Sequence, residues 1–284
     1  ESVETGTLRL WSHDSFGEDL LINPRDGGIY YWDATSPSAR ATNITAATGT
    51  SQPQVAKQIL VSDKDRHVLA FGCDPETNAG VQDPLLIRFS AQESFTDWAS
   101  TADNTAGDLR LGVGTTFVAA VETNRETLVF TDVSLHSMQF IGPPFTFGIN
   151  QIASNTTIMS PNAVEAVQDL VFWMGIEDFY VYAGNTAKLP CTLRGYVFND
   201  INLSQRSKVV AGVNSSFSEI WWFYPSASSS DNDRYVVYNY AEQVWYYGAL
   251  ARSAWLDRGV NDDPISAGEN GYLYLQEIGY DDGS

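Results

Sequence analysis

The chain has 284 residues, of which 43% are hydrophobic and 18% are charged; this composition is typical of a globular protein and excludes an intrinsically disordered one. It has no run of eighteen apolar residues that could span a bilayer as a helix, so we expect no membrane insertion by this chain. The 16 basic and 35 acidic residues give a net charge of −19. This charge argues against a protein that binds nucleic acid through a basic patch and against docking on anionic lipid, because both need clustered Lys and Arg.

Short β-strands dominate the sequence pattern. A helix of one or two turns is expected at Ser51–Leu60, where Val55, Ile59 and Leu60 share one helical face. The glycine-rich segment Gly107–Gly114 predicts a strand and a turn, and not a phosphate-binding loop. Strand segments rich in β-branched and aromatic residues, bounded by turn residues, occur in chain order at Thr7–Trp11, Leu128–Phe130, Ile220–Tyr224 and Tyr272–Leu275.

An internal repeat runs along the chain: a short apolar strand, a polar turn and a strand with aromatic residues. The copies are Leu20–Trp32, Leu85–Trp98, Leu128–Phe140, Leu170–Tyr182 and Tyr235–Tyr247, with a shorter sixth copy at Ile265–Leu275. The first five copies begin 65, 43, 42 and 65 residues apart, which fits a period near 43 interrupted by two insertions. Because a four-stranded propeller blade has roughly 40–50 residues, the repeat predicts an all-β fold, a β-propeller of about six blades. The alternative is a β-sandwich or jelly roll, which would also have many short strands but not this repeated unit.

The aromatic residue near the end of each copy is predicted to pack as a wedge between neighbouring blades, because a single hairpin cannot bury its own apolar face. These residues are Trp32, Trp98, Phe140, Tyr182 and Trp245. Trp173 is likewise expected to be a buried anchor of its blade.

No linker of low complexity divides the sequence, so we predict a single β-propeller domain over residues 1–284. Two polar segments, Ala34–Ala56 and Gly184–Lys208, are predicted to be loop excursions on one face of the propeller, where contacts to neighbouring molecules tend to lie. Ser226–Asp233 is predicted to be a flexible hairpin tip.

The residue types that carry catalysis or bind metals show no informative spacing. Cys73 and Cys191 are far apart and are predicted to be two buried, reduced thiols, in preference to a disulfide. The three histidines, His13, His67 and His136, lack the spacing of a zinc site. From Glu1 onward no secretory leader pattern is visible. We therefore predict no catalytic residue, no metal ligand and no cofactor, and a protein that is not an enzyme.

Acidic residues are numerous but are not arranged as a site. Acidic pairs occur at Asp63 and Asp65, Asp231 and Asp233, Asp262 and Asp263, and Asp281 and Asp282. None has the ordered spacing of a calcium loop, so solvated turns are predicted. The segment Asp26–Trp32 is similar to the aspartate box of sialidase-type propellers, although its Trp falls one place late; that box is structural and does not predict catalysis.

The most specific part of the sequence runs from Arg125 to Asn185. It resembles the propeller-type tail hub, nozzle and packaged-DNA-stabilisation proteins of short-tailed bacteriophages. Phe130, Met138 and Phe140 hold the positions of a first unit. The second unit's positions are held by Ser160, Pro161, Val164, Val171, Trp173, Gly175, Tyr180, Tyr182 and Gly184. Arg234–Gly248 is similar to another blade of the family, and the whole match covers about half of the chain.

The resemblance implies a non-enzymatic structural protein of the virion tail. Copies of the chain would form a ring around a channel for DNA ejection and would contact an adaptor and a needle or fibre. An acidic lumen would repel phosphate, so that DNA passes without specific binding. Two other hypotheses stay open: a glycan-binding or sialidase-like propeller that uses aromatic residues such as Trp221 and Trp222, and some other scaffold or adhesion β-protein.

Overall fold

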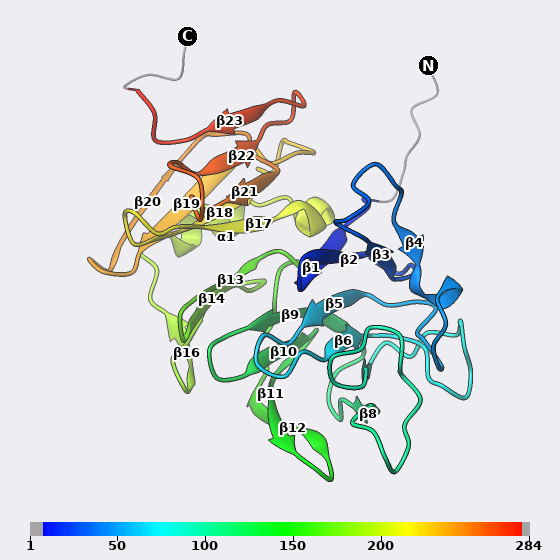
Figure 1. The fold of residues 1–284 in the computed structure, drawn as a ribbon. Helices are drawn as coiled ribbons and strands as arrows, with labels where there is room; N and C mark the ends of the chain where they lie inside the picture. Colours follow the sequence, from blue (N-terminus) through cyan, green and yellow to red (C-terminus); the bar gives the residue numbers. More distant parts are fainter. Residues whose placement is uncertain (1–7, 280–284) are drawn as a thin grey trace. The chain divides into compact units, whose positions relative to one another are not determined.

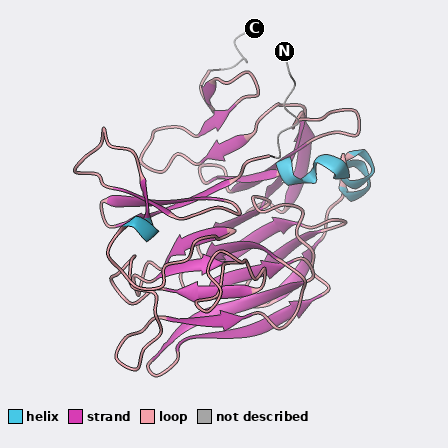
Figure 2. Cartoon of the chain, turned by 90° about the vertical axis from the view of Figure 1, so that its right-hand side faces the viewer, coloured by secondary structure: helices cyan, strands magenta, loops and turns pink. Residues whose placement is uncertain are grey.

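The computed structural model describes residues 8–279, and β-strands make up nearly all of its regular structure (Figures 1 and 2). The chain divides into two compact units, residues 1–156 and residues 157–284. No helix among the described residues is long and apolar enough to cross a membrane.

The first unit contains three four-stranded antiparallel sheets, each made from consecutive strands. The first sheet is formed by β1 (Trp11–Phe16), β2 (Asp19–Pro24), β3 (Tyr30–Trp32) and β4 (Thr42–Asn43), and the short helix η1 (Ile44–Ala46) follows it. The second sheet is formed by β5 (Gln58–Val61), β6 (Val68–Phe71), β7 (Leu86–Phe89) and β8 (Gly107–Arg110). The third is formed by β9 (Phe117–Glu122), β10 (Thr127–Thr131), β11 (Ser134–Gly142) and β12 (Thr146–Ser154).

The second unit has two four-stranded sheets and one three-stranded sheet, again from consecutive antiparallel strands. The fourth sheet of the chain is formed by β13 (Val164–Val167), β14 (Leu170–Met174), β15 (Phe179–Tyr182) and β16 (Thr186–Leu189), and α1 (Arg194–Asp200) and η2 (Leu203–Lys208) follow it. The fifth is formed by β17 (Val210–Asn214), β18 (Glu219–Tyr224), β19 (Arg234–Asn239) and β20 (Val244–Gly248). The sixth is formed by β21 (Ala254–Leu256), β22 (Ile265–Ala267) and β23 (Leu273–Leu275).

Six successive antiparallel sheets, each closed within its own stretch of sequence, form a six-bladed β-propeller. This confirms the predicted fold class. In a sandwich or jelly roll, strands from distant parts of the chain would pair in Greek-key order, whereas every neighbour pair here is consecutive. The prediction that all 284 residues form one domain stays a prediction.

Five of the six predicted repeats coincide with a pair of neighbouring strands, and Leu85–Trp98 covers one strand only. Four copies cover the second and third strands of a sheet, whereas Leu85–Trp98 begins at the third strand of its sheet and Tyr235–Tyr247 covers the third and fourth. The true second strands begin 43 to 59 residues apart, at Asp19, Val68, Thr127, Leu170, Glu219 and Ile265. The two spacings of 65 residues therefore come from the choice of strand and not from insertions. Both middle strands of a blade are buried and apolar, so their composition alone does not tell them apart.

The predicted excursions contain regular structure. Ala34–Ala56 includes the fourth strand of the first sheet and η1, and its Ile44 is buried. Gly184–Lys208 includes the fourth strand of the fourth sheet as well as α1 and η2. Both excursions therefore contain more regular structure than loops alone, because outer strands are short and polar and resemble loops in sequence. Their place on one face of the propeller stays a prediction.

Of the other local predictions, the helix at Ser51–Leu60 is wrong: residues 51–57 form no helix, and the rest of the segment lies in β5. Gly107–Gly114 contains β8 followed by a turn, as predicted. For Thr7–Trp11, the structure begins β1 only at Trp11, and Thr7 lies outside the described residues.

The core lies between neighbouring sheets. One buried cluster joins the first and second sheets and includes Leu21, Ile29, Ile59, Val68 and Trp98. Another joins the second and third sheets and includes Phe71, Ile87, Phe117, Val129 and Met138. Each cluster draws on two sheets, so the second sheet is covered on both faces.

The predicted aromatic wedges divide into three groups by their exposure. Trp98 and Tyr182 are buried, with 1% and 6% of their surface exposed, which confirms their core position. Trp32 and Trp245 are half-buried. Phe140 is 41% exposed, so its assignment as a buried wedge is wrong. It lies on the part of β11 that extends beyond its pairing with β10, which ends at Met138.

Candidate functional site

The first strands of neighbouring sheets lie side by side within each unit. In the first unit β1 contacts β5 and β5 contacts β9, and in the second unit β13 contacts β17 and β17 contacts β21 (Figure 1). In a β-propeller the blades are arranged around a central channel, and the strands that converge are the ones that border it. The two rows of first strands are therefore the candidate functional site.

In the first unit, side chains form hydrogen bonds with the backbone groups at the edges of these strands. The Ser12 hydroxyl and the Asp14 carboxylate of β1 accept hydrogen bonds from the backbone N–H groups of Ile59 and Val61 in β5, at 3.1 and 2.8 Å. The Gln58 side chain of β5 makes two bonds to Ala120 of β9: its Oε1 accepts from the backbone N–H at 3.0 Å, and its Nε2 donates to the carbonyl at 2.7 Å. The backbone groups that a sheet edge would leave unpaired thus have side-chain partners.

The charged residues within the six first strands, all of which are described, are acidic: Asp14, Glu122 and Glu165. Asp63 and Asp257 add two further carboxylates shortly after β5 and directly after β21. No Lys or Arg occurs within these six described strands. The strands themselves therefore carry negative charge only, whereas the flanking residues also include Lys57, Lys64 and Arg258.

In the first unit, the pKa values of Asp14 and Glu122 depend on the charges of neighbouring carboxylates. Burial, followed by the charge of Asp63, raises the pKa of Asp14 although two backbone N–H groups donate to it. Burial also raises the pKa of Glu122 to about 7, and the charges of Asp63 and Asp14 add to this effect. The Glu122 carboxylate accepts a bond from the backbone N–H of Asp63 at 3.2 Å. Near neutral pH, Glu122 therefore changes between its neutral and charged forms.

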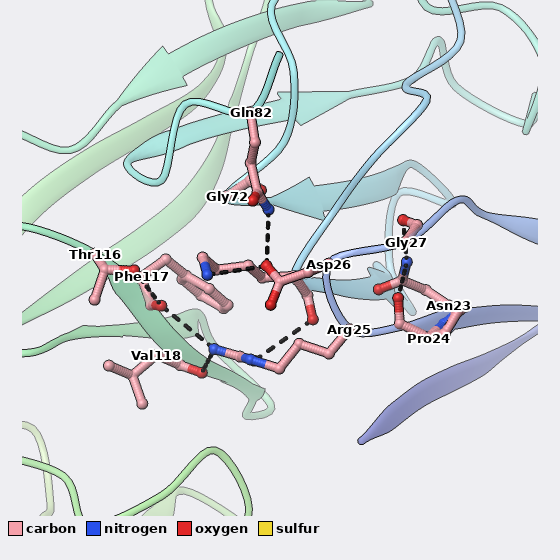
Figure 3. A network of polar contacts seen from close by, with 11 residues as sticks. Asn23, Pro24, Arg25, Asp26, Gly27, Gly72, Gln82, Thr116, Phe117 and Val118 are labelled. Atoms are coloured by element: carbon pink, nitrogen blue, oxygen red, sulfur yellow. Dashed lines mark hydrogen bonds and ion pairs between the residues drawn. The ribbon is translucent and has the colours of Figure 1, made fainter. Parts of the chain in front are cut away.

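A polar network lies at the other end of these strands, around the turn between β2 and β3 (Figure 3). The Arg25 guanidinium donates to the carbonyls of Val118 and Phe117 in β9, at 3.0 and 3.4 Å, and to the carbonyl of Lys57 at 3.5 Å. Burial lowers the pKa of Arg25. One side chain of the first sheet thus binds backbone of both other sheets in its unit.

Asp26 makes a second connection from the same turn. Its carboxylate pairs with the Lys57 ammonium at 3.0 Å and accepts from Gln82 Nε2 at 3.1 Å, and the same Gln82 nitrogen donates to the Gly72 carbonyl at 2.6 Å (Figure 3). Burial opposes ionisation of Asp26, but these partners hold its pKa below the ordinary value. Asn23 Nδ2 stabilises the turn by donating to the carbonyls of Pro24, Gly27 and Gly28. The aspartate-box-like segment thus begins in a turn that joins sheets.

The aromatic residues considered for glycan stacking lie in the core. Trp222 is fully buried, and its indole N–H donates to the Ala163 carbonyl at 3.1 Å. Trp221 is half-buried, with ring centroids of Trp255 and Tyr235 at 5.3 and 4.8 Å. Both residues pack between strands, so neither offers a free ring face to a sugar.

An aromatic cavity lies elsewhere, beside the first sheet. It has a volume of about 580 Å³ and is lined by Trp11, Ile22, Pro24, Arg25 and Tyr30, among others. Trp11 is 54% exposed, so its ring is available to a ligand. The alternation along β1, β2 and β3 places these side chains on one face of the sheet.

The predicted thiols and histidines contribute no site. Cys73 and Cys191 are both free, and burial raises the pKa of their thiols to about 12 and about 11; Cys73 is buried as predicted, whereas Cys191 is only half-buried. His67 and His136 are buried, which lowers the pKa of both rings. No group of three or more His, Cys, Asp or Glu within residues 8–279 could hold a metal ion.

One acidic pair predicted to be solvated has structural partners instead. Asp233 accepts from the backbone N–H and the hydroxyl of Ser226 at 2.7 and 2.8 Å, and Asp231 pairs with Lys208 at 2.6 Å. These bonds order the connection between β18 and β19, where a hairpin tip was predicted. The pair Asp281 and Asp282 lies outside the described residues.

The contacts of Arg25, Gln58 and Gln82 were not predicted from the sequence. All three bind backbone groups: Arg25 and Gln58 bind strand residues far away in sequence, such as Val118 for Arg25, and Gln82 binds the carbonyl of Gly72, ten residues before it. Every residue offers a backbone carbonyl, and every residue except proline a backbone N–H, whatever its side chain. The sequence therefore contains no signal for these contacts.

Comparison with known proteins supports the fold alone. No protein-family model and no curated protein matches the chain. The crystal structure of Kluyvelomyces marxianus Hsv2 is similar, with a TM-score of 0.52 at 9% identity, over 96% of this chain and 73% of Hsv2. The extracellular domain of BT4673 from B. thetaiotaomicron has a TM-score of 0.59 at 11% identity, over 98% of this chain; this chain spans only 33% of that one. At such low identity these likenesses carry no function to this chain.

Proposed function

We propose that this chain is a structural protein of a bacteriophage tail, a hub or nozzle component that has no enzymatic activity. It acts in the virion, in a ring of copies, where its first strands border the path of the DNA and its loops contact adaptor, fibre or needle proteins. The proposal rests on the sequence resemblance over Arg125–Asn185 and Arg234–Gly248.

The observation that carries the proposal is the sign of the charges on the first strands. Asp14, Glu122 and Glu165 are the only Asp, Glu, Lys or Arg residues within these described strands. Burial raises the pKa of Glu122 to about 7 and that of Glu165 to about 8, so their negative charge is complete only above neutral pH. Duplex DNA carries one negative charge per roughly 1.7 Å of its axis, and carboxylates that border its path repel it. DNA can then slide without sticking, as ejection requires.

The direct test is the composition of purified particles. Phage particles from the source of this sequence are purified by density gradient, the proteins are identified by mass spectrometry, and the chain is located by antibody labelling in the electron microscope. We expect the chain in the particle and the label at the tail. Intact particles that lack the chain would overturn the proposal.

DNA binding gives an independent test. Lumen carboxylates predict that the chain does not retain a 100-base-pair duplex on a filter, even at low salt where electrostatic binding is strongest. Retention that weakens steeply with added salt would contradict a repelling path.

A second function, glycan binding, is favoured by one observation, the cavity at Trp11 and Tyr30. An exposed aromatic ring beside the guanidinium of Arg9, an exposed residue that also lines this cavity, is a suitable surface for a sugar ring with an acidic group. Binding on a glycan array that is lost in Trp11→Ala and kept in Phe217→Ala, which alters an exposed aromatic residue elsewhere, would support this function. Hydrolysis of a fluorogenic glycoside that depends on one carboxylate would contradict the virion proposal.

A further inference from the structure

The third sheet carries a hairpin that extends past the rest of its blade. β11 and β12 have nine residues each, whereas β9 and β10 have six and five (Figure 1). The pairing of β10 with β11 ends at Met138. The outer part of the hairpin, Gln139–Gly148, is therefore a two-stranded ribbon, which we call the projecting ribbon.

Two contacts anchor one side of the projecting ribbon to the second sheet and to the loop between its strands β7 and β8. Phe147 is 5% exposed and packs against the rings of Phe89 and His67, with centroids 5.0 and 5.2 Å apart. The Thr146 hydroxyl donates to the Thr105 carbonyl at 3.1 Å. Because an isolated two-stranded hairpin is marginally stable in water, these contacts explain how the ribbon keeps its shape.

The remaining exposed surface of the hairpin is uncharged and combines large apolar side chains with the polar residues Gln139, Asn150 and Gln151. Ile141 and Phe145 at the tip are 56% and 71% exposed, and Phe140 and Ile152 are 41% and 37% exposed. Among the described strands only β11 pairs with β12, so β12 presents an open edge of nine residues, about 30 Å long. Proteins usually protect such an edge with charges, a short strand or a covering element.

This hairpin has no charge to protect it. No Asp, Glu, Lys or Arg occurs between Asp132 and Glu165, in a chain with 51 charged residues among 284. An open edge, exposed aromatic and aliphatic side chains and the absence of charge together mark a surface that is covered by a partner.

We infer that the β11–β12 hairpin is the contact through which a second copy of this chain binds; this deepens the proposed function, on which it rests. Two copies with a net charge of −19 each repel one another. Because the hairpin has no charged side chain, a contact through it places no hairpin carboxylate next to the other copy. It also buries no charge without a partner. A strongly basic partner would instead bind the acidic surfaces of the chain. The hairpin therefore suits a copy of the chain itself.

The inference is tested by light scattering coupled to size-exclusion chromatography, on the purified chain between about 1 and 100 µM. We expect the wild-type chain to assemble above the monomer mass of 31.3 kDa. Assembly should strengthen with added salt, which screens the repulsion between copies. The double variant Ile141→Asp with Phe145→Asp should weaken assembly at least about 30-fold, the size of a hot-spot effect.

The matched control is Phe217→Asp, which places the same new charge on another exposed phenylalanine, 53% exposed, in the turn after β17. It should assemble like the wild-type chain. The melting temperature of each variant shows that it is folded.

A wild-type chain that stays monomeric at 100 µM, or a folded double variant that assembles as well as the wild type, would overturn the inference. The second outcome leaves the ring of the proposed function intact and shows that another surface forms it. Absence of the chain from particles, by contrast, would defeat the proposed function whatever the oligomeric state.

Discussion

Trp173 offers the most direct test of the packing between strands. Its side chain is fully buried in β14, its ring stacks on Tyr180 at 5.3 Å, and its indole N–H donates to the Thr157 carbonyl at 3.2 Å. Trp173→Ala removes the ring and leaves a cavity, which costs about 3–5 kcal/mol of the free energy of unfolding. A domain of roughly this size loses about 2–4 °C per kcal/mol, so the melting temperature should fall by roughly 6–20 °C.

The assay is thermal unfolding followed by near-ultraviolet circular dichroism, with urea unfolding as a second measure. Trp173→Phe keeps an aromatic ring but leaves the Thr157 carbonyl without this donor, so it should cost less, about 1–3 kcal/mol. Trp11→Ala is the control, because Trp11 is 54% exposed, and it should cost at most about 1 kcal/mol. A melting temperature that is the same in Trp173→Ala and the wild type would refute the assignment of Trp173 to the core.

Three further predictions concern the polar contacts. Gln58→Ala leaves the N–H and carbonyl of Ala120 without these partners and should cost about 2–3 kcal/mol in urea unfolding; an unchanged midpoint would mean that water replaces the amide. Folding raises the pKa of Glu122 from 4.5 to about 7, so its contribution to stability is complete below pH 4.5 and is lost as the pH rises through 7. Glu122→Gln should therefore be more stable than the wild type at pH 8, by at most about 3 kcal/mol, and the difference should shrink towards pH 4; equal differences at both pH values would contradict this assignment. Asp233→Ala removes both acceptors of Ser226 and should cost about 1–2 kcal/mol, whereas Asp233→Asn should keep part of this stability; equal losses would show that the hydrogen bonds are not responsible.

The blades were predictable from the sequence because their middle strands are apolar on both faces. Leu128–Phe130 and Ile220–Tyr224 lie in β10 and β18, where almost every side chain is buried. A continuous apolar run of this length, bounded by turn residues and rich in β-branched and aromatic residues, is typical of a strand that is covered on both sides. The repeat of such runs was enough to identify the propeller.

The strand at β5 was missed because its short pattern fits two periods. Ile59 and Val61 are buried and Leu60 is half-buried, as expected for alternation in a strand. Val55, Ile59 and Leu60 also fall on one face of a helix, and nothing local decides between the two patterns. The decision comes from tertiary structure, where β5 lies between β1 and β9.

The sequence showed that the chain is acidic but not where its acidic residues lie. The net charge of −19 does not say which strands carry the carboxylates. Asp14, Asp63 and Glu122 are separated by 49 and 59 residues, and only the side-by-side packing of first strands brings them together. The hairpin of the third sheet was misjudged at Phe140 for a related reason, since the length of a strand beyond its neighbour is not encoded in its own composition.

The consecutive order of strands has a consequence for biosynthesis. Each sheet is complete within a few tens of residues, so a blade can form soon after its last strand leaves the ribosome. The bond from Arg25 to Val118 spans 93 positions and is available only after the second sheet and the first strand of the third sheet have been translated. Arg25 therefore joins parts of the chain that fold at different times. Its loss should slow the packing of the first sheet against the third more than the formation of the first sheet itself.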